Sequence, residues 1–305
     1  MPEPGTTDFP APIGATLADL PPEVAAALER PTPGRRGVVP AAGIPFATLE
    51  WGDPAAPPVL LVHGVTSLAG TWWRIGPSLA AAGYRVIAID LPGHGATGAW
   101  AGRHRFADTA ADLAALVRAA GLDGRELRVV GHSWGALAAA HLPAAGLRPR
   151  VLVLLDPPAL PVSAMAAMIV DPVERHYDDL DEATRAIRAA NPSWDDGDVA
   201  AKAEGLTFFE ESAVRAVLLD NGDWDGGLAA LADTRAAGVE TRLVRGEPAT
   251  GSMVPEETLP AFAERIGADH ILTIAGGAHS PHRMHPEATL VALLRALEGD
   301  GLEGR

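Results

Sequence analysis

The chain has 305 residues, of which 48% are hydrophobic and 21% are charged, and its formal net charge at pH 7 is −15. This negative balance argues against nucleic acid or an anionic membrane surface as a partner, because both bind clustered Lys and Arg. The chain has no cysteine, which excludes disulfides, thiolate metal ligands and a cysteine nucleophile. No apolar run approaches the ~20 residues that span a bilayer. Residues 1–10 also lack the basic and apolar regions of a secretory signal, so we expect a cytoplasmic protein.

Residues 1–34 are rich in Pro, Ala and Thr and read as an irregular N-terminal arm. Within this arm, residues 21–30 form a candidate short helix with Pro22 near its start. Two short strand candidates follow at 37–40 and 44–51, and the Gly-containing turn between them suggests a hairpin.

Strand and helix patterns then alternate along most of the chain. A continuous apolar run, which suits a strand buried on both faces of a parallel sheet, occurs at 57–64, and a second buried-strand run occurs at 84–90. Further strand-like patterns occur at 126–131, 150–156, 240–246 and 270–276. Helical patterns follow these runs at 71–83, 106–121, 134–146, 255–267 and 286–299. Such alternation is typical of an α/β fold whose mostly parallel sheet is flanked by helices. We expect this core to comprise residues 35–157 and 237–305.

Residues 158–236 interrupt that rhythm. They lack long β-type runs and contain several helical patterns. A helical segment between two strands of one sheet predicts a cap over the carboxyl edge of the sheet, inserted after the sixth strand.

The segment "GHSWG" at 131–135 fits the pattern G-x-S-x-G, with a strand pattern before it and a helix pattern after it. In this context the pattern predicts a nucleophile elbow, in which Ser133 stands on a tight turn at the sheet edge. The flanking glycines allow close backbone approach, and the helix start directs N–H groups toward the serine.

A serine needs a neighbouring base to act as a nucleophile. His279 is the strongest candidate, because it follows the last strand and precedes the last helix, at the same sheet edge as Ser133. The spacing of His279, His282 and His285 raises the alternative of a metal site. We instead expect the latter two to be solvated loop residues and no metal to bind.

The dipeptide His63-Gly64 ends the first buried strand and marks a candidate oxyanion loop. We expect the N–H groups of Val65 and Trp134 to hold the oxyanion, and His63 to be structural.

Several stretches together resemble the α/β-hydrolase superfamily in its capped, epoxide-hydrolase-like branch, over about residues 36–298. They are "LLVHGVTSLAGTWW", "YRVIAIDLPGHGATG", "GHSWG", "LVLLDPP" and "GGAHSPHRMHPE". Haloalkane dehalogenases and epoxide hydrolases of this superfamily carry an aspartate nucleophile where this chain has Ser133. The resemblance therefore argues against both of those activities. It also implies that Asp90 and His94 fix the loop after the fourth strand, at 84–90.

The position of the catalytic acid is open. The resemblance predicts an Asp three residues beyond Gly246, but this chain has Ala249 there. Asp156, at the end of the strand after Ser133, is the favoured candidate, and Glu247 is the alternative. The third possibility is another residue, or a dyad of Ser133 and His279 without an acid. Either carboxylate could orient His279 and stabilise its imidazolium.

These residues predict a serine hydrolase that cleaves a carboxylic ester or lactone without any cofactor. A C–C bond hydrolase of diketone type and a non-hydrolytic ligand-binding protein are the alternatives. The expected partner is a small to medium apolar molecule enclosed by the cap. Candidate substrate-binding residues are Trp72, Trp73, Met165, Met168, Phe208 and Phe209.

Overall fold

The computed structural model describes residues 8–98, 104–124 and 126–299. Its main sheet has eight strands in the order β1-β2-β4-β3-β5-β6-β9-β10. The first two strands run antiparallel to their neighbours, and the others pair in parallel. The strands are β1 (Arg35–Ala41), β2 (Ile44–Trp51), β3 (Pro58–Val62), β4 (Arg85–Ile89), β5 (Arg128–His132), β6 (Val151–Leu155), β9 (Glu240–Arg245) and β10 (Ile271–Thr273).

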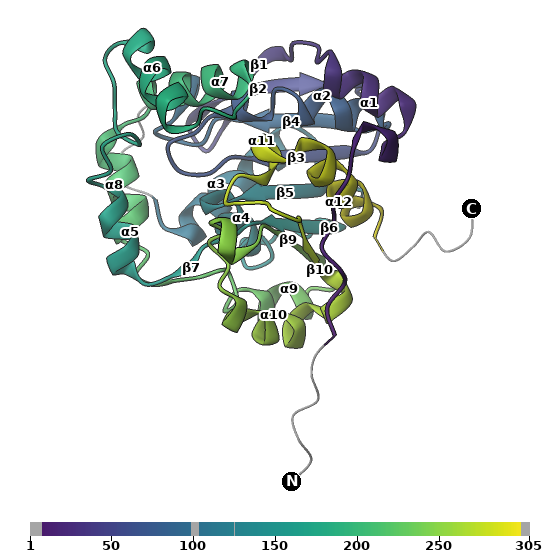
Figure 1. Ribbon diagram of the computed structural model, residues 1–305. Coiled ribbons are helices and arrows are strands. Elements are labelled where there is room, and N and C mark those ends of the chain that lie inside the picture. The colour runs from purple at the N-terminus through teal and green to yellow at the C-terminus, as the bar shows by residue number, and fades with distance from the viewer. Residues whose placement is uncertain (1–7, 99–103, 125, 300–305) are drawn as a thin grey trace.

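Helices cover both faces of this sheet (Figure 1). They are α1 (Pro22–Glu29), α2 (Ile75–Ala81), α3 (Phe106–Ala119), α4 (Trp134–Ala140), α9 (Leu231–Ala236), α10 (Leu259–Ile266), α11 (Pro281–Met284) and α12 (Pro286–Glu298). The expected α/β fold, with a mostly parallel sheet and a helical insertion after β6, is confirmed.

The apolar runs became strands because both of their faces are buried. Along β3, Leu60 and Val62 belong to the core that includes α3 and α4. Val59 and Leu61 face the opposite way, into the core formed with α1, α2 and α12. Successive side chains of a strand point to opposite faces, so a strand between two helical layers is apolar at every position.

The described part of the N-terminal arm is tied to the far edge of the sheet. Ile13 exchanges backbone hydrogen bonds with Thr273 and Ala275, at the end of β10. Farther along, Leu20, Val24 and Leu28 are buried in the core beside α2 and α12. The arm therefore contributes apolar side chains to the core formed with α1, α2 and α12, which we call the second core.

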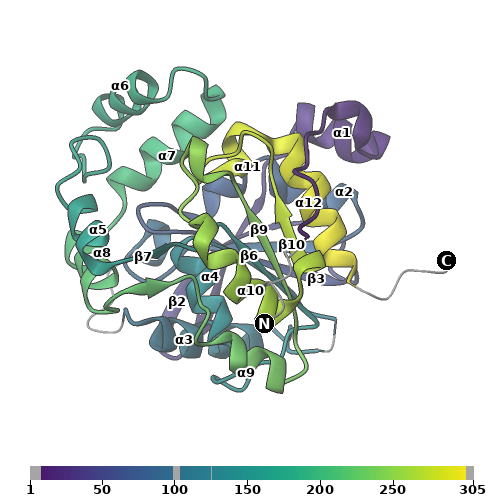
Figure 2. The same cartoon turned by 60° about the horizontal axis from the view of Figure 1, so that its bottom comes forward.

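The insertion after β6 contains α5 (Val162–Met168), α6 (Leu180–Ala190), α7 (Asp196–Thr207) and α8 (Glu211–Leu219). These four helices lie together on one side of the molecule in both views (Figures 1 and 2). A two-stranded sheet of β7 (Ala159–Leu160) and β8 (Trp224–Asp225) pairs the two ends of this cap. In contrast, α9 packs against β9 and α10 in the core. Among the described residues, no helix combines the length and apolarity needed to cross a membrane.

Candidate active site

Ser133 stands on a sharp turn between β5 and α4. Its backbone has φ 54° and ψ −124°, a conformation that non-glycine residues rarely adopt. The turn requires small neighbours. A Cβ on Gly131 would meet the backbone oxygen of Gly135 at 2.4 Å, and a Cβ on Gly135 would meet the backbone oxygen of His63 at 2.5 Å. The two glycines therefore let β5, α4 and the end of β3 come close enough to present the serine at the sheet edge.

His279 lies between Ser133 and Asp156. Its Nε2 is 3.0 Å from Ser133 Oγ, and its Nδ1 is 2.7 Å from Asp156 Oδ2. These three residues come from the turn after β5, the end of β6 and the loop after β10. Because these strands are parallel, their carboxyl ends meet at one edge and bring together residues up to 146 positions apart.

The Asp156 carboxylate is fully buried and anchored by four donors. Oδ1 accepts from the Gly246 N–H at 3.0 Å and from the Ser252 hydroxyl at 2.6 Å. Oδ2 accepts from the Met253 N–H at 3.0 Å and from His279 Nδ1. These hydrogen bonds give the buried carboxylate its polar partners and fix its orientation.

The alternative carboxylate, Glu247, faces a different group. Its Oε2 accepts a hydrogen bond of 3.0 Å from the Gly276 N–H, at the beginning of the loop that carries His279. Thr250 and Ser252 donate their backbone N–H groups to the Glu247 carbonyl. In this structure Asp156, rather than Glu247, is the carboxylate paired with His279.

Two backbone N–H groups flank the serine. Trp134 is the first residue of α4, so its N–H has no acceptor within the helix. Val65 follows Gly64, whose backbone passes so close to the elbow that a Cβ there would meet Ser133 Cβ at 2.8 Å. The next residue, Thr66, has a strained φ of 54°. The predicted oxyanion loop therefore lies directly against the serine, and Val65 lines the same cavity.

A buried network ties that loop to the cap. Lys202 of α7 donates to the Thr66 carbonyl at 3.0 Å and to its hydroxyl oxygen at 2.9 Å, and also forms an ion pair with Glu174. The Thr66 hydroxyl is within 2.8 Å of Glu174 Oε2. Burial lowers the pKa of Lys202, while the nearby carboxylate of Glu174 opposes this shift.

Other histidines contact the backbone of the loop that carries His279. His132 donates from Nε2 to the His279 carbonyl at 2.8 Å, and its ring lies 4.9 Å from that of His279. Burial holds the pKa of His132 well below its ordinary value, so this ring is neutral near pH 7. The expectation of a solvated loop residue was wrong for His282, which is buried with its ring 5.1 Å from the ring of Trp72. His285 instead donates to the Gly276 carbonyl at 3.0 Å.

The loops that precede the elbow are also held by buried polar groups. His63 Nε2 accepts from the Leu91 N–H at 2.9 Å, and burial lowers the pKa of His63 to about 4. Asp90 accepts from the N–H groups of Ala69 and Ala96 at 2.6 and 2.8 Å. A neutral imidazole and a fixed carboxylate thus clamp the turns after β3 and β4.

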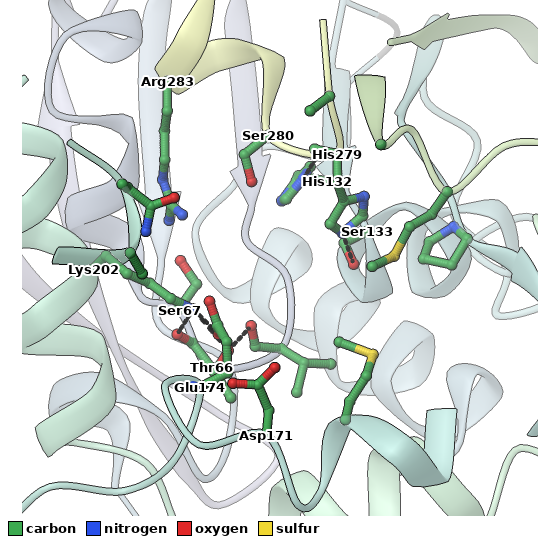
Figure 3. A pocket seen from close by; sticks show the side chains of 18 of the residues that line it. Thr66, Ser67, His132, Ser133, Asp171, Glu174, Lys202, His279, Ser280 and Arg283 are labelled. Atoms are coloured by element: carbon green, nitrogen blue, oxygen red, sulfur yellow. Dashed lines mark hydrogen bonds and ion pairs between the residues drawn. The ribbon is translucent and has the colours of Figure 1, made fainter. Parts of the chain in front are cut away.

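A cavity of about 530 Å³ opens over Ser133 and His279 and is walled by the cap (Figure 3). Of the six candidate substrate-binding residues, Met165 and Met168 line it. Phe209 lies in a neighbouring cavity that shares Val65 and Met168 with this one. Methionine side chains pack adaptably around varied apolar ligands.

Besides Phe209, three of the expected substrate-binding residues do not line this cavity. Trp72 is fully buried in the second core, and Trp73 donates from Nε1 to Asp198 of α7 at 3.0 Å, so it helps to fasten the cap. Phe208 is 56% exposed and lines a separate surface pocket, which it shares with residues of β1 and β2. Trp72 therefore serves core packing, and Trp73 serves attachment of the cap.

The cavity is also lined by charged side chains that the sequence motifs did not predict as site residues. They are Asp171, Glu174, Lys202 and Arg283. Two features of the sequence could have pointed to two of these four residues. Lys202 is the only lysine of the chain, and Arg283 lies four residues beyond His279. Among the described residues, no group of three His, Asp or Glu side chains is arranged to hold a metal ion.

The sequence matches a known family and several known proteins. Residues 57–265 match the family described as "alpha/beta hydrolase fold". The chain is 31% identical over 265 residues to lipase LipV of Mycobacterium tuberculosis, covering 82% of this chain and 96% of that protein. It is 35% identical over 125 residues to epoxide hydrolase A of the same organism, covering 39% and 37% of the two chains.

Solved structures give the same picture of the fold. E-2-(acetamidomethylene)succinate hydrolase superposes with a TM-score of 0.72 at 22% identity, covering 87% of this chain and 99% of that one. An esterase from Rhodococcus sp. ECU1013 superposes with a TM-score of 0.67 at 21% identity, covering 87% and 98%. By its sequence match, its sheet order and its strained serine turn, the chain belongs to the α/β-hydrolase fold family.

Proposed function

We propose that this protein is a serine hydrolase that cleaves a carboxylic ester or lactone through an acyl-enzyme. The observation that carries the proposal is the position of His279, within hydrogen-bond distance of both Ser133 Oγ and Asp156 Oδ2. A base held between a hydroxyl and a buried carboxylate has the arrangement that activates serine nucleophiles.

In the proposed reaction, His279 Nε2 takes the Ser133 proton while Oγ attacks the substrate carbonyl. The N–H groups of Val65 and Trp134 bind the resulting oxyanion. The His279 imidazolium, stabilised by Asp156, then gives its proton to the departing alkoxide, which leaves as an alcohol or as the free hydroxyl end of an opened lactone. Water activated by the same imidazole releases the acid and restores Ser133. Each oxyanion donor is expected to contribute ~3 kcal/mol to transition-state stabilisation.

Two comparisons bear on the choice of reaction. Similarity to a lipase over most of both chains favours ester chemistry. Similarity to an epoxide hydrolase covers a shorter segment, and Ser133 cannot supply the carboxylate that forms the alkyl ester of the aspartate-dependent enzymes. The partly apolar cavity favours an acyl or alcohol group of small to medium size.

The test is labelling by a fluorophosphonate probe, which reacts with activated serines. We expect the native protein to label, Ser133→Ala to lose the label, and Ser280→Ala to keep it as a control for another cavity serine. Absence of labelling in the native protein, or equal labelling of Ser133→Ala, would overturn the assignment. A panel of 4-nitrophenyl esters and aliphatic lactones then measures turnover. Labelling without turnover of any ester or lactone would favour the diketone or ligand-binding alternatives.

A further inference from the structure

Arg283 is a buried cation in the wall of the cavity that holds Ser133. It belongs to α11, the short helix directly after the loop of His279, and is only 6% exposed. One Nη donates to the Thr71 hydroxyl at 2.8 Å, and the guanidinium lies 4.9 Å from the centre of the Trp194 ring. Its Nε is buried and has no hydrogen-bond partner among the described residues. In Figure 3 its guanidinium end lies on the same side of the cavity as Lys202 and Ser67.

The charges around Arg283 leave it without a carboxylate of its own. Glu174 pairs with Lys202, and Asp171 accepts from the backbone N–H groups of Val173 and Glu174. Within the described part of the chain, neither acid forms an ion pair with Arg283. Burial lowers the pKa of Arg283 to about 10, so the group remains charged near pH 7.

A buried guanidinium with an unused donor is unfavourable unless a partner replaces the lost water. Arg283 lines the cavity, and its other Nη forms no hydrogen bond among the described residues and is not one of the buried atoms, so a ligand can reach it there, whereas Nε is closed to solvent. The stacking on Trp194 and the bond to Thr71 hold the guanidinium plane in place, so little entropy is lost when it binds.

We propose that Arg283 binds a carboxylate carried by the substrate, away from the carbonyl that Ser133 attacks. The inference rests on the proposed function and narrows it to esters or lactones of a dicarboxylic acid or of another acid-bearing molecule. A planar carboxylate can accept two parallel N–H···O bonds from the edge formed by the two Nη atoms, because each Nη carries two hydrogens and Thr71 uses only one of them. Met165 and Met168 then contact the apolar chain between the two groups.

The experiment compares two 4-nitrophenyl esters of equal chain length, the hydrogen glutarate, which carries a free carboxylate, and the neutral hexanoate. We expect the native protein to favour the hydrogen glutarate ester in kcat/KM by about 10- to 100-fold, the range for charge-assisted hydrogen bonds. Arg283→Gln removes this preference, measured as the ratio of kcat/KM for the two esters within one variant, and the loss for the hydrogen glutarate ester appears in KM. Arg185→Gln, on the exposed face of α6, is the matched control and keeps the preference.

A second measurement does not depend on turnover. Calorimetry with Ser133→Ala should show glutarate binding at least about 10-fold more tightly than its diamide, and this difference should vanish in Ser133→Ala/Arg283→Gln. If Arg283→Gln does not fold, Arg283→Lys keeps the charge and the stem but loses the planar edge. We expect it to lower the hydrogen glutarate preference by about 10-fold.

Equal use of the two esters, an unchanged preference in Arg283→Gln, or equal binding of glutarate and its diamide would overturn the proposal. In each case the proposed function would still stand if the fluorophosphonate labels Ser133. Failure of that labelling would instead overturn the hydrolase assignment, while a glutarate preference lost with Arg283 would still identify a carboxylate site.

Discussion

Replacing Asp156 by Asn tests the choice of acid most directly. The carboxylate accepts from the Gly246 N–H and the Ser252 hydroxyl through Oδ1, and from the Met253 N–H and His279 through Oδ2. An amide offers one oxygen and one NH₂ group. Whichever way it turns, its NH₂ group faces a backbone N–H, that of Gly246 or that of Met253. One buried donor therefore loses its acceptor, at ~1–3 kcal/mol in the free energy of unfolding.

The effect on catalysis is larger than the effect on stability. If the amide NH₂ faces His279, Nδ1 must become an acceptor, so Nε2 carries the proton and can no longer take one from Ser133. If the amide oxygen faces His279, the tautomer is kept but no negative charge stabilises the imidazolium. We expect kcat to fall by about 10³- to 10⁴-fold, or ~4–5.5 kcal/mol in the activation free energy.

The assay is hydrolysis of 4-nitrophenyl butyrate by native protein, Asp156→Asn and Glu247→Gln, with urea unfolding to measure stability. Glu247→Gln is the matched control, because a Gln oxygen can still accept from the Gly276 N–H, and its kcat should stay within about 3-fold. If Asp156→Asn keeps more than about a tenth of kcat, or if Glu247→Gln shows the larger loss, the acid is not Asp156.

Three further predictions concern the groups around the site. Lys202→Met should lower the free energy of unfolding by ~1–3 kcal/mol, because the carboxylate of Glu174, itself 36% exposed, loses its cation. Urea unfolding should show that Lys202→Met/Glu174→Gln restores part of this loss, and an equal loss in the single and the double variant would contradict an energetic coupling between the two residues. Gly135→Ala should destabilise by ~3 kcal/mol or more, because its Cβ would meet the His63 backbone oxygen at 2.5 Å, whereas Gly124→Ala, with open space around it, should be nearly neutral in thermal unfolding. The pKa of His63 is about 4 in the folded protein and ~6.5 in the unfolded chain, so the free energy of unfolding that His63 contributes should be full above pH 6.5 and fall by ~1.4 kcal/mol per pH unit from there toward pH 4. Urea midpoints of His63→Asn, measured across this pH range, should lack this part of the dependence on pH, and an unchanged dependence would show that His63 is not the group responsible.

The fold was predictable because its signals are local. Every residue of a strand such as β3 must be apolar to lie between two helical layers, and such a run is visible in the sequence. The glycines around Ser133 are visible for the same reason, since the turn tolerates no Cβ at Gly131 or Gly135. Sequence alone therefore located Ser133 and His279 on turns at one edge of a parallel sheet.

Contacts between distant segments had no such signal. Trp72 and Trp73 looked equally suited to a substrate pocket, but one is buried in the second core and the other fastens the cap. Lys202 could not be linked to Thr66 from the sequence, because 136 residues separate them.

The amino-acid sequence by itself determined the alternation of strands and helices, the insertion after β6, and the positions of Ser133 and His279. It left Asp156 and Glu247 as alternatives, because both follow buried strands that end at the same sheet edge. Only the tertiary structure directs Asp156 toward His279 and Glu247 toward Gly276. The physical reason is that a carboxylate's partner depends on where β6, β9 and the loop after β10 meet in space, and local sequence does not encode that meeting.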